Sequence, residues 1–428
     1  MNVNSENNNL SSETGACQVM IKPVGPACNL SCRYCYYTQK CGADGSGSKE
    51  MMSENLLELF FRQLFLSYSG ECVSITWHGG EPLLRGIDFY KKAMELQRRY
   101  GDRRLVENSI QTNGVLVDEN WCRFFHENRF LVGLSIDGLE HVHDRYRKDR
   151  SGKGTYSRVM RAMSLFQKHD VEFNTISTVN DYSSQYPLEI YRFLKESDVH
   201  FMQFIPVVEC ITCHSEGAQS RTIPPGARTG KPVAPWSAKP LDYGRFLVRI
   251  FEEWVTSDVG RYFVPFFDAV LGNWCGVDAS LCVMAKECGK AVVLESDGSL
   301  YSCDHYVFPE YRLGNIKQKS FPELLHSGRQ KRFGRSKHEQ LTSDCRKCEY
   351  LFLCHGECPR NRFVVSPHEK FGHNYLCEGL KLFFRKTEPS MRYMRNELMN
   401  GRLAEGVMDW HRRLNSNVKA QVFSEHKG

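Results

Sequence analysis

The cysteines constrain this chain more than any other feature of its sequence. Among the 428 residues are 18 cysteines, and eight of these fall between Cys282 and Cys377. The segment Met1 to Gly15 is rich in Asn and Ser and lacks the basic start and apolar core of a secretory signal, which predicts a cytoplasmic location. Because cytosolic thiols stay reduced, clustered cysteines indicate bound metal rather than disulfides.

Composition and charge exclude several other classes of protein. Apolar residues make up 41% of the chain and charged residues 25%, which is typical of a globular protein, and the length predicts two or three domains. No apolar run reaches the roughly 18 residues that a membrane span needs, so we expect no membrane partner. The net charge of +6 is mild, and without a concentrated basic face we expect no nucleic-acid partner.

The first half of the chain alternates between short apolar, β-branched runs and amphipathic stretches of helical period. The runs predict strands at 19–24, 72–76, 109–112, 130–136, 172–178 and 201–206, and the stretches predict helices at 54–68, 87–100, 119–128, 155–169 and 186–196. Such alternation predicts an α/β fold with a parallel sheet. Six units fit a partial (β/α)6 TIM-like barrel better than a full eight-unit barrel.

The second half has a different character. Segments 41–49 and 215–240 are rich in Gly, Ser or Pro and are predicted loops, and a helix is expected at 241–257 with one apolar face. A hairpin is expected around Asp297-Gly298, and a helical tail from Cys377 onward. The predicted divisions are a disordered tail at 1–16, a barrel at 17–240, a connecting helix at 241–272, a cysteine-rich domain at 273–385 and a helical tail at 386–428.

One short motif carries the most specific chemistry. Directly after the first expected strand stands a C-x3-C-x2-C loop formed by Cys28, Cys32 and Cys35. Three thiolates on one loop can hold three irons of a four-iron cluster and leave the fourth open, and an open position is where a substrate or cofactor binds. The alternatives are a loop with incidental buried thiols and a zinc site completed by a distant residue.

This loop resembles that of the radical S-adenosylmethionine enzymes. Their pattern is C-x3-C-x-aromatic-C after the first strand of a partial (β/α)6 barrel, and Tyr34 fills the aromatic position. The segments 78–82 (HGGEP), 111–114 (QTNG) and 135–138 (SIDG), each after an expected strand, are also similar to that family. Barrel enzymes keep their sites at such strand ends.

The resemblance implies how S-adenosylmethionine would be bound. Tyr34 and Gly80 would line its methionine end, Ser135 and Arg147 would contact its ribose and carboxylate, and the backbone of Val208 would meet the adenine. By themselves, Gly79 and Gly80 fit a tight strand-to-helix turn equally well. Arg147, within an Asp-Arg-Tyr-Arg-Lys-Asp run, fits a solvated charged segment.

Eight further cysteines in the second half fit two more clusters or, on spacing alone, two zinc sites. Their arrangement is similar to the SPASM extension of radical enzymes that modify peptides, which favours iron. By that resemblance one auxiliary cluster is held by Cys282, Cys288, Cys303 and Cys358, and the other by Cys345, Cys348, Cys354 and Cys377.

Seven cysteines remain outside these sets: Cys17, Cys41, Cys72, Cys122, Cys210, Cys213 and Cys275. Most are interpreted as small and inert. The run from Cys210 to His214 has the spacing of c-type haem attachment, but that modification follows export, so we interpret the run as a coincidence within a loop.

The resemblance narrows to the anaerobic sulfatase-maturating enzymes through segments 131–138, 202–205, 296–307 and 313–316. It implies oxidation of a Cys or Ser in a C/S-x-P-x-R motif of a sulfatase polypeptide to Cα-formylglycine. The implied cofactors are S-adenosylmethionine and three 4Fe-4S clusters, and the implied electron source is an external flavodoxin- or ferredoxin-type reductant. Asp304 holds the position of the proposed catalytic base, although alone it fits a hairpin-end carboxylate facing water.

Two rival functions stay open from the sequence. One is a SPASM enzyme that acts on another peptide, for example by forming thioether links. The other is a zinc-stabilised binding module without catalysis. The choice between Cys-type and Ser-type substrates, the client sulfatases and the oligomeric state are not indicated by the sequence.

Overall fold

The structure is a computed structural model that describes residues 17–37, 50–68, 70–211, 233–365, 368 and 372–414. The expected tail at 1–16, the expected loop at 41–49, most of the loop at 215–240 and the last part of the helical tail lie outside the described residues.

A nine-stranded sheet organises the chain, in the order β6-β5-β4-β3-β2-β1-β7-β8-β9. The first six strands are all parallel, and each pairs with its neighbour in sequence. They are β1 (Cys17–Ile21), β2 (Cys72–Trp77), β3 (Leu105–Thr112), β4 (Leu131–Ser135), β5 (Phe173–Val179) and β6 (Met202–Pro206). The predicted partial barrel of six strand-helix units is therefore confirmed.

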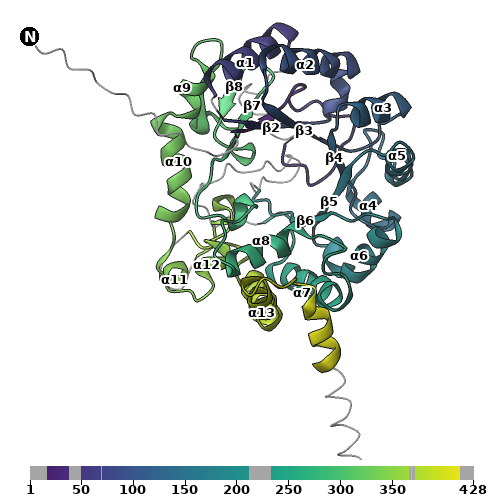
Figure 1. The fold of residues 1–428 in the computed structure, drawn as a ribbon, viewed down its shortest axis with the longest axis vertical. Helices are drawn as coiled ribbons and strands as arrows, with labels where there is room; N and C mark the ends of the chain where they lie inside the picture. The colour runs from purple at the N-terminus through teal and green to yellow at the C-terminus, as the bar shows by residue number, and fades with distance from the viewer. Residues whose placement is uncertain are drawn as a thin grey trace, which may run out of the picture.

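Helices cover the outside of this curved sheet, as Figure 1 shows around the strands. They are α1 (Glu54–Ser67), α2 (Ile87–Tyr100), α3 (Glu119–Glu127), α4 (Glu140–Tyr146), α5 (Tyr156–Lys168) and α6 (Pro187–Glu196). Ser53 caps α1 and Asp118 caps α3, each by accepting a hydrogen bond from a backbone N–H of the first turn. Helix α4 was not predicted from the sequence, because only Val142, His143 and Tyr146 of its seven residues are buried.

Strand β3 begins four residues earlier than predicted. Glu107 and Asn108 interrupt its apolar pattern, which hid the first half of the strand. The Asn108 side chain is buried but satisfied: its Oδ1 accepts from Trp77 Nε1 and Gln97 Nε2, both at 3.0 Å, and its Nδ2 donates to Gln97 Oε1 at 2.8 Å. A buried amide is tolerated in a strand when its hydrogen bonds are made.

The cysteine-rich half continues the same sheet. Strand β7 (Ala291–Leu294) pairs in parallel with β1, and β8 (Ser299–Tyr301) and β9 (Arg312–Asn315) follow in antiparallel order. The turn between β7 and β8 contains Asp297 and Gly298, which confirms the predicted hairpin; Gly298 has a positive φ of 89°. This half is therefore joined to the barrel by backbone hydrogen bonds.

Two helices occupy 241–272, where a single connecting helix was predicted. Helix α7 (Pro240–Ser257) ends at Ser257, and α8 (Pro265–Trp274) begins at Pro265, after a turn that contains Gly260 with a positive φ of 82°. The predicted apolar face of α7 is buried and includes Phe246, Phe251 and Trp254. Helix α13 (Cys377–Met399) begins where the helical tail was predicted and packs along α7, beside which Figure 1 draws it.

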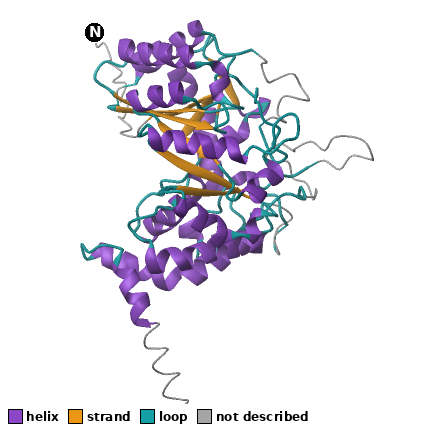
Figure 2. Ribbon diagram, turned by 90° about the vertical axis from the view of Figure 1, so that its right-hand side faces the viewer, coloured by secondary structure: helices purple, strands orange, loops and turns teal. Residues whose placement is uncertain are grey.

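Short helices make up most of the remaining structure, and Figure 2 shows helices on both sides of the strands. The α-helices are α9 (Phe321–Leu325), α10 (Gly328–Glu339), α11 (Ser343–Arg346) and α12 (Leu351–Cys354). The 3-10 helices are Pro82–Arg85, Ser183–Gln185, Cys282–Met284, Asp304–Tyr306, Pro309–Tyr311 and Pro359–Asn361. No helix among the described residues combines the length and apolar character needed to cross a bilayer.

The contact between α7 and α13 depends on two glycines. A Cβ on Gly379 would lie 1.9 Å from the Pro240 carbonyl oxygen, and one on Gly244 would lie 2.4 Å from the Gly379 carbonyl oxygen. Both obstacles are backbone atoms that cannot rotate away. We expect Gly379→Ala to push α13 off α7 and lower the free energy of unfolding by about 1–3 kcal/mol.

Urea unfolding of the full chain measures this effect, with Gly272→Ala as the matched control. A Cβ on Gly272, within α8, would meet nothing closer than 4.0 Å, so the control should be neutral or gain up to about 1 kcal/mol. Because Cys377 lies two residues before Gly379, the Gly379 variant should also bind less iron. Equal stability of the two variants would contradict this account of the helix contact.

Candidate functional site

The loop that follows β1 brings Cys28, Cys32 and Cys35 together at the carboxyl end of the strand. The backbone N–H of Leu30 donates to Cys28 Sγ at 3.4 Å, and Asn113 Nδ2 donates to the same sulfur at 3.8 Å. Burial raises the pKa of Cys28 to about 11 and that of Cys32 to about 12, and the charge of Cys35 adds to both shifts. Neighbouring thiols with sulfur-directed donors are suited to a metal cluster, which binds them as thiolates and displaces their protons.

The glycine-rich segment after β2 packs against this cysteine loop. Gly80 donates its N–H to Gly25 O at 2.8 Å, and a Cβ on Gly80 would lie 2.0 Å from Ala27 O. Gly79 has a positive φ of 125°. The tight turn given above as an alternative is therefore present. Glycine is needed there because the backbone of this segment contacts the backbone of the cysteine loop.

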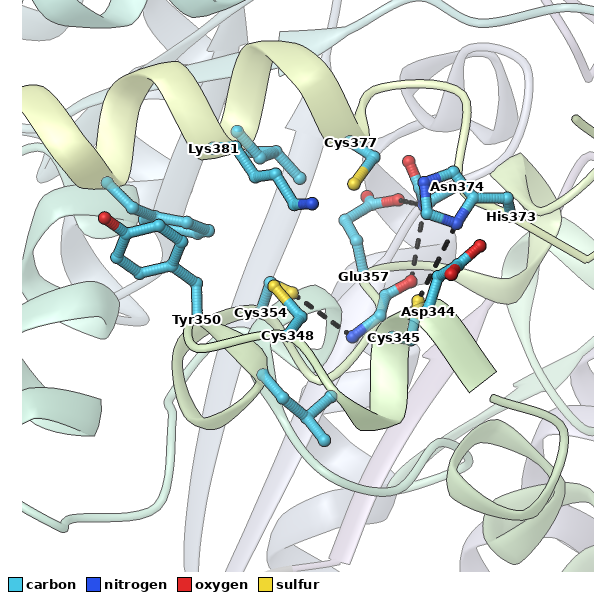
Figure 3. Close-up of a pocket in the computed structure, with 14 residues that line it drawn as sticks. Asp344, Cys345, Cys348, Tyr350, Cys354, Glu357, His373, Asn374, Cys377 and Lys381 are labelled. Atoms are coloured by element: carbon cyan, nitrogen blue, oxygen red, sulfur yellow. Dashed lines mark hydrogen bonds between the residues drawn. The ribbon is translucent and has the colours of Figure 1, made fainter. Parts of the chain in front are cut away.

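Four cysteines of the second half line a single cavity. Cys345, Cys348, Cys354 and Cys377 line it together with Glu357, His373 and Asn374 (Figure 3). The backbone N–H of Gly356 donates to Cys354 Sγ at 3.4 Å, and His373 Nδ1 lies 4.0 Å from Cys345 Sγ. Hydrogen bonds to Cys345 and Cys377 raise the pKa of His373 to about 10, so the imidazole is positively charged beside these thiols.

The other four cysteines of the second half also lie together. Burial raises the pKa of Cys303 to about 12, with smaller increases from the charges of Asp304, Cys282 and Cys288. The pKa of Cys358 is raised by burial, by the charge of Glu357 and by the charges of Cys303 and Cys288. The structure thus groups the eight thiols into the two sets that the sequence resemblance implied; their ligation stays a prediction.

These groupings fit iron–sulfur clusters better than zinc. In the described parts of the chain, no three His, Cys, Asp or Glu side chains converge closely enough to hold one metal ion. Zinc needs such convergence, because its ligands lie about 2.0–2.3 Å from one centre. A four-iron cluster instead binds one thiolate at each iron, so its ligands surround a volume. A cavity lined by four cysteines matches the second requirement.

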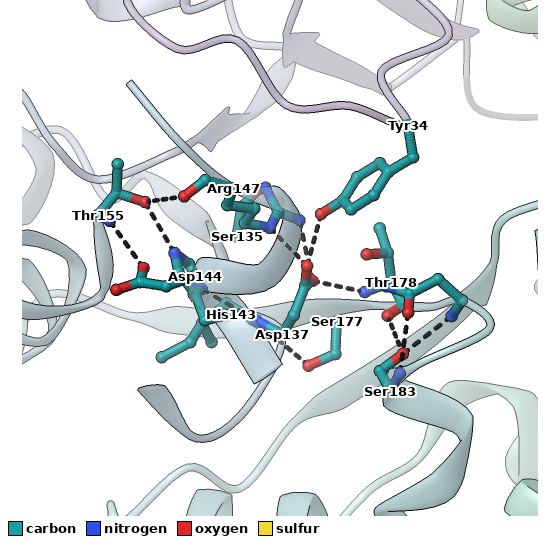
Figure 4. A network of polar contacts seen from close by, with 12 residues as sticks. Tyr34, Ser135, Asp137, His143, Asp144, Arg147, Thr155, Ser177, Thr178 and Ser183 are labelled. Atoms are coloured by element: carbon teal, nitrogen blue, oxygen red, sulfur yellow. Dashed lines mark hydrogen bonds and ion pairs between the residues drawn. The ribbon is translucent and has the colours of Figure 1, made fainter. Parts of the chain in front are cut away.

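A buried polar network occupies the ends of β4 and β5. Arg147 donates to both carboxylate oxygens of Asp137, from Nε at 2.9 Å and from Nη2 at 3.1 Å (Figure 4). Tyr34 donates its hydroxyl to Asp137 at 2.5 Å, and the Thr178 N–H donates at 2.8 Å. Arg147 is only 7% exposed, so the alternative that it lies in a solvated charged segment is wrong.

Electrostatics keep this network ionised. Burial alone would raise the pKa of Asp137, but the Arg147 guanidinium outweighs it and lowers that pKa. His143, whose Nε2 lies 2.9 Å from Thr155 Oγ1, has its pKa lowered to about 4 by burial and by Arg147, so it is neutral. Asp137 and Arg147 therefore form a fixed pair next to Tyr34, the aromatic residue of the cysteine loop.

The remaining residues predicted to bind S-adenosylmethionine lie on the same side of the barrel. Ser135 ends β4, and its Oγ accepts from Gln111 Nε2 at 2.9 Å. Val208 is buried two residues after the end of β6. Tyr34, Gly80, Ser135, Arg147 and Val208 thus all follow or end parallel strands at their carboxyl ends, or lie on loops that contact those ends.

Asp304 is held by two residues that the sequence did not single out. Its carboxylate forms an ion pair with Lys22 and accepts a hydrogen bond from the Tyr36 hydroxyl. The Asp304 side chain is 15% exposed and that of Lys22 is fully buried, so the carboxylate does not simply face water. The Lys22 ammonium also lies 3.6 Å from the centroid of the Tyr37 ring.

A second ion pair lies in the same region. Arg360, two residues after Cys358, pairs with Glu209, three residues after the end of β6, and its guanidinium stacks 5.2 Å from the Tyr36 ring centroid. The Tyr36 pKa is raised well above its ordinary value by burial and by Asp304, so the phenol keeps its proton. Asp304 thus accepts a hydrogen bond from a protonated Tyr36.

Lys22, Tyr36 and Asp137 are functional candidates that sequence reasoning missed. Lys22 interrupts an otherwise apolar strand end, and a buried lysine there is a signal of a charged partner. Tyr36 directly follows Cys35, and Asp137 lies inside the quoted SIDG segment. None of the 16 cysteines among the described residues forms a disulfide; Cys41 and Cys213 lie outside those residues, as does His214 of the haem-like run.

The fold and cysteine groups define a radical enzyme with iron–sulfur clusters, and family matches agree. Residues 23–194 match the Radical SAM superfamily, and residues 282–349 match an iron-sulfur cluster-binding domain, SPASM. Both the predicted enzyme class and the predicted cofactors, S-adenosylmethionine and 4Fe-4S clusters, are thereby confirmed. A zinc-stabilised module without catalysis is left without support.

Comparison with individual proteins narrows the group of radical enzymes that the chain is similar to. It is 46% identical to the serine-type anaerobic sulfatase-maturating enzyme of Bacteroides thetaiotaomicron, over 91% of this chain and 94% of that one. It is 36% identical to a cysteine-type enzyme of Clostridium perfringens, over 89% and 98% of the two chains. The solved structure of anSMEcpe with bound AdoMet and the Cp18Cys peptide superposes with a TM-score of 0.78 at 34% identity, covering 89% of this chain and 99% of that one.

The chain belongs to the anaerobic sulfatase-maturating enzymes. The resemblance inferred from its sequence is confirmed, and with it the activity of that family, the oxidation that produces formylglycine in sulfatases.

The Asp137–Arg147 pair yields a direct test of the cofactor pocket. We expect Arg147→Met to lower the free energy of unfolding by about 3–5 kcal/mol, because Asp137 stays buried without its counter-charge. S-Adenosylmethionine binding, measured by equilibrium dialysis on anaerobically reconstituted protein, should weaken as well. The double variant Asp137→Asn/Arg147→Met should recover part of the stability.

Arg123→Met is the matched control for this test. Arg123 is exposed on α3, where it lies 3.8 Å from Glu119 and donates to Asn120 Oδ1 at 2.6 Å. Because these contacts face water, its loss should change stability by no more than about 0.5 kcal/mol. A small loss at Arg147, comparable to that at Arg123, would mean that the buried pair contributes little.

Proposed function

We propose that this chain oxidises the Cys or Ser of a C/S-x-P-x-R motif in a sulfatase polypeptide, with Asp304 as the base that receives the substrate proton. The observation that carries this proposal is the hydrogen bond from Tyr36 to Asp304. Tyr36 directly follows Cys35, and Asp304 directly follows Cys303. The carboxylate therefore stands between the first cysteine loop and the inner auxiliary group, which consists of Cys282, Cys288, Cys303 and Cys358.

The proposed cofactor arrangement assigns each cysteine group to one cluster. Cys28, Cys32 and Cys35 would hold the cluster with an open iron, next to Tyr34, Gly80, Ser135, Arg147 and Val208. When bound there, S-adenosylmethionine and the cluster supply a 5′-deoxyadenosyl radical, and the protein positions that chemistry and excludes water. The two auxiliary sets, 282/288/303/358 and 345/348/354/377, would hold the other clusters.

Asp304 would act after hydrogen has been removed from the substrate Cβ. The carbon radical left on the substrate must lose one electron and the proton of its thiol or hydroxyl group. An Asp carboxylate has a reference pKa near about 4, so it takes that proton only when the transfer is coupled to the oxidation. The Lys22 ammonium favours the ionised carboxylate, which is the form that accepts a proton.

The partners of this reaction follow from its chemistry. The substrate is a polypeptide segment, and reductive cleavage of S-adenosylmethionine requires an external one-electron donor of the flavodoxin or ferredoxin type. The 46% identical relative is named as serine-type, which makes a serine substrate the first to test. We infer a cytoplasmic location, where the thiols of these cysteine groups stay reduced.

Two peptides test the function directly. Anaerobically reconstituted protein with S-adenosylmethionine and a strong reductant is incubated with a Ser-x-Pro-x-Arg or a Cys-x-Pro-x-Arg peptide. We expect mass spectrometry to detect conversion of the CH2OH or CH2SH group to an aldehyde, with 5′-deoxyadenosine formed alongside. Deoxyadenosine without aldehyde from either peptide would move the substrate to another peptide and overturn the proposal.

Asp304→Asn tests the base. The variant should still form 5′-deoxyadenosine, while aldehyde formation should fall about a hundredfold or more, because no carboxylate is present to take the proton. Iron content and circular dichroism establish that the variant folds and holds its clusters. Glu310→Gln, an exposed carboxylate six residues further on, is the control and should keep full activity. Unchanged aldehyde yield in Asp304→Asn would exclude Asp304 as the base.

A further inference from the structure

Lys337 is a fully buried lysine that the reaction, as described so far, does not use. It lies on α10, with no exposed surface. Its ammonium donates to the carbonyl oxygens of Cys282, at 2.7 Å, and Val283, at 3.0 Å. Two carbonyl dipoles are a small compensation for taking an ammonium group out of water.

No carboxylate pairs with this ammonium among the residues that the structure describes. Lys22 and Arg147, which are buried, and Arg360, which is half-buried, each have an acidic partner within ion-pair distance. Glu357 is the acid whose charge raises the pKa of Lys337, but its carboxylate accepts hydrogen bonds from Asn361 at 3.0 Å and Asn374 at 2.6 Å. A buried ammonium without a carboxylate is strongly unfavourable unless another negative group faces it.

Lys337 lies near cysteines that would carry negative charge as the thiolates of a bound cluster. Burial lowers the pKa of Lys337, and the charges of Cys288, Cys358, Glu357 and Cys282 act in the opposite direction. The three cysteines belong to the inner auxiliary group.

We propose that Lys337 is the counter-charge of the auxiliary cluster held by Cys282, Cys288, Cys303 and Cys358, and that it raises the reduction potential of that cluster. The proposal rests on the ligand set assigned under the proposed function. A positive charge stabilises the reduced form of a cluster more than the oxidised form, because the reduced form carries one more negative charge. Lys337 touches no reacting atom, and its charge would act only on the potential of the cluster.

This role fits the electron balance of the reaction. The carbon radical of the substrate loses one electron, its S–H or O–H proton passes to Asp304, and a C=S or C=O bond forms. Cys303 directly precedes Asp304, and the auxiliary cluster that it would help to hold would supply the acceptor for that electron. A cluster with a raised potential accepts that electron more readily. Water then converts a C=S product to the aldehyde with release of hydrogen sulfide.

The test compares Lys337→Gln, which removes the charge but keeps a polar end, with Lys337→Arg, which keeps the charge. Lys331→Gln is the control, since Lys331 is exposed on the same helix. The measurement is a potentiometric titration of the full-length, reconstituted protein followed by electron paramagnetic resonance, together with iron analysis. We expect Lys337→Gln to shift the midpoint potential of one auxiliary cluster to a more negative value and to leave the other cluster unchanged.

The conservative and control variants show whether the charge of Lys337 causes the shift in potential. Lys337→Arg and Lys331→Gln should keep the wild-type midpoint potentials. In Lys337→Gln, the amount of aldehyde formed per 5′-deoxyadenosine should fall several-fold, because electron removal from the substrate is impaired while radical formation is not. A Gln variant that fails to fold, beside an Arg variant with wild-type potentials, would also support the need for charge.

Other outcomes would overturn the proposal. Wild-type potentials in an iron-replete Lys337→Gln variant would exclude a role for the charge, and failure of both variants to fold would point to a purely steric role. Iron sufficient for the first cluster alone would refute the ligand set. A shifted potential in a protein that oxidises neither sulfatase peptide would leave the role of Lys337 intact and refute the proposed function instead.

Discussion

The parallel pairing of β7 with β1 is the constraint on which the rest of the structure depends. It runs from Gln18 opposite Ala291 to Ile21 opposite Leu294, and the Lys22 N–H extends it by donating to Leu294 O at 2.9 Å. Strand β1 therefore lies between the barrel and the cysteine-rich half. The loop that leaves its carboxyl end carries the first three cysteines, and the hairpin paired with it leads to Cys303 and Asp304. One backbone ladder thus sets the distance between the two halves of the site.

Buried charges hold that junction in place. Lys22 with Asp304 and Arg360 with Glu209 join segments that are far apart in the sequence, and Arg147 with Asp137 joins the end of α4 to the loop after β4. Burying an ion pair contributes little net stability, but removing one partner is severely unfavourable, so such pairs favour a single arrangement of the segments they join. Lys337 differs, because its ammonium donates to two carbonyl oxygens and pairs with no carboxylate among the described residues.

Much of the fold followed from patterns along the chain. The apolar runs and amphipathic stretches predicted all six barrel strands and five of their helices, since each element buries one continuous face. The errors arose where polar residues are buried. Asn108 hid the start of β3, and α4 was missed because its buried face includes His143. In both places tertiary hydrogen bonds satisfy groups that a sequence pattern assigns to solvent.

The sequence by itself determined the class of chemistry: the C-x3-C-x2-C loop is a local spacing, and the family that the chain resembles implied the two auxiliary cysteine sets. Only the tertiary structure decided which charges meet. Arg147 looked solvated and is buried on Asp137, and Lys22 looked like a strand residue and binds Asp304, 282 positions away. The physical reason is that the three thiols of the first loop are close together in sequence and can be recognised there, whereas the partners of a buried ion pair need only be close in space.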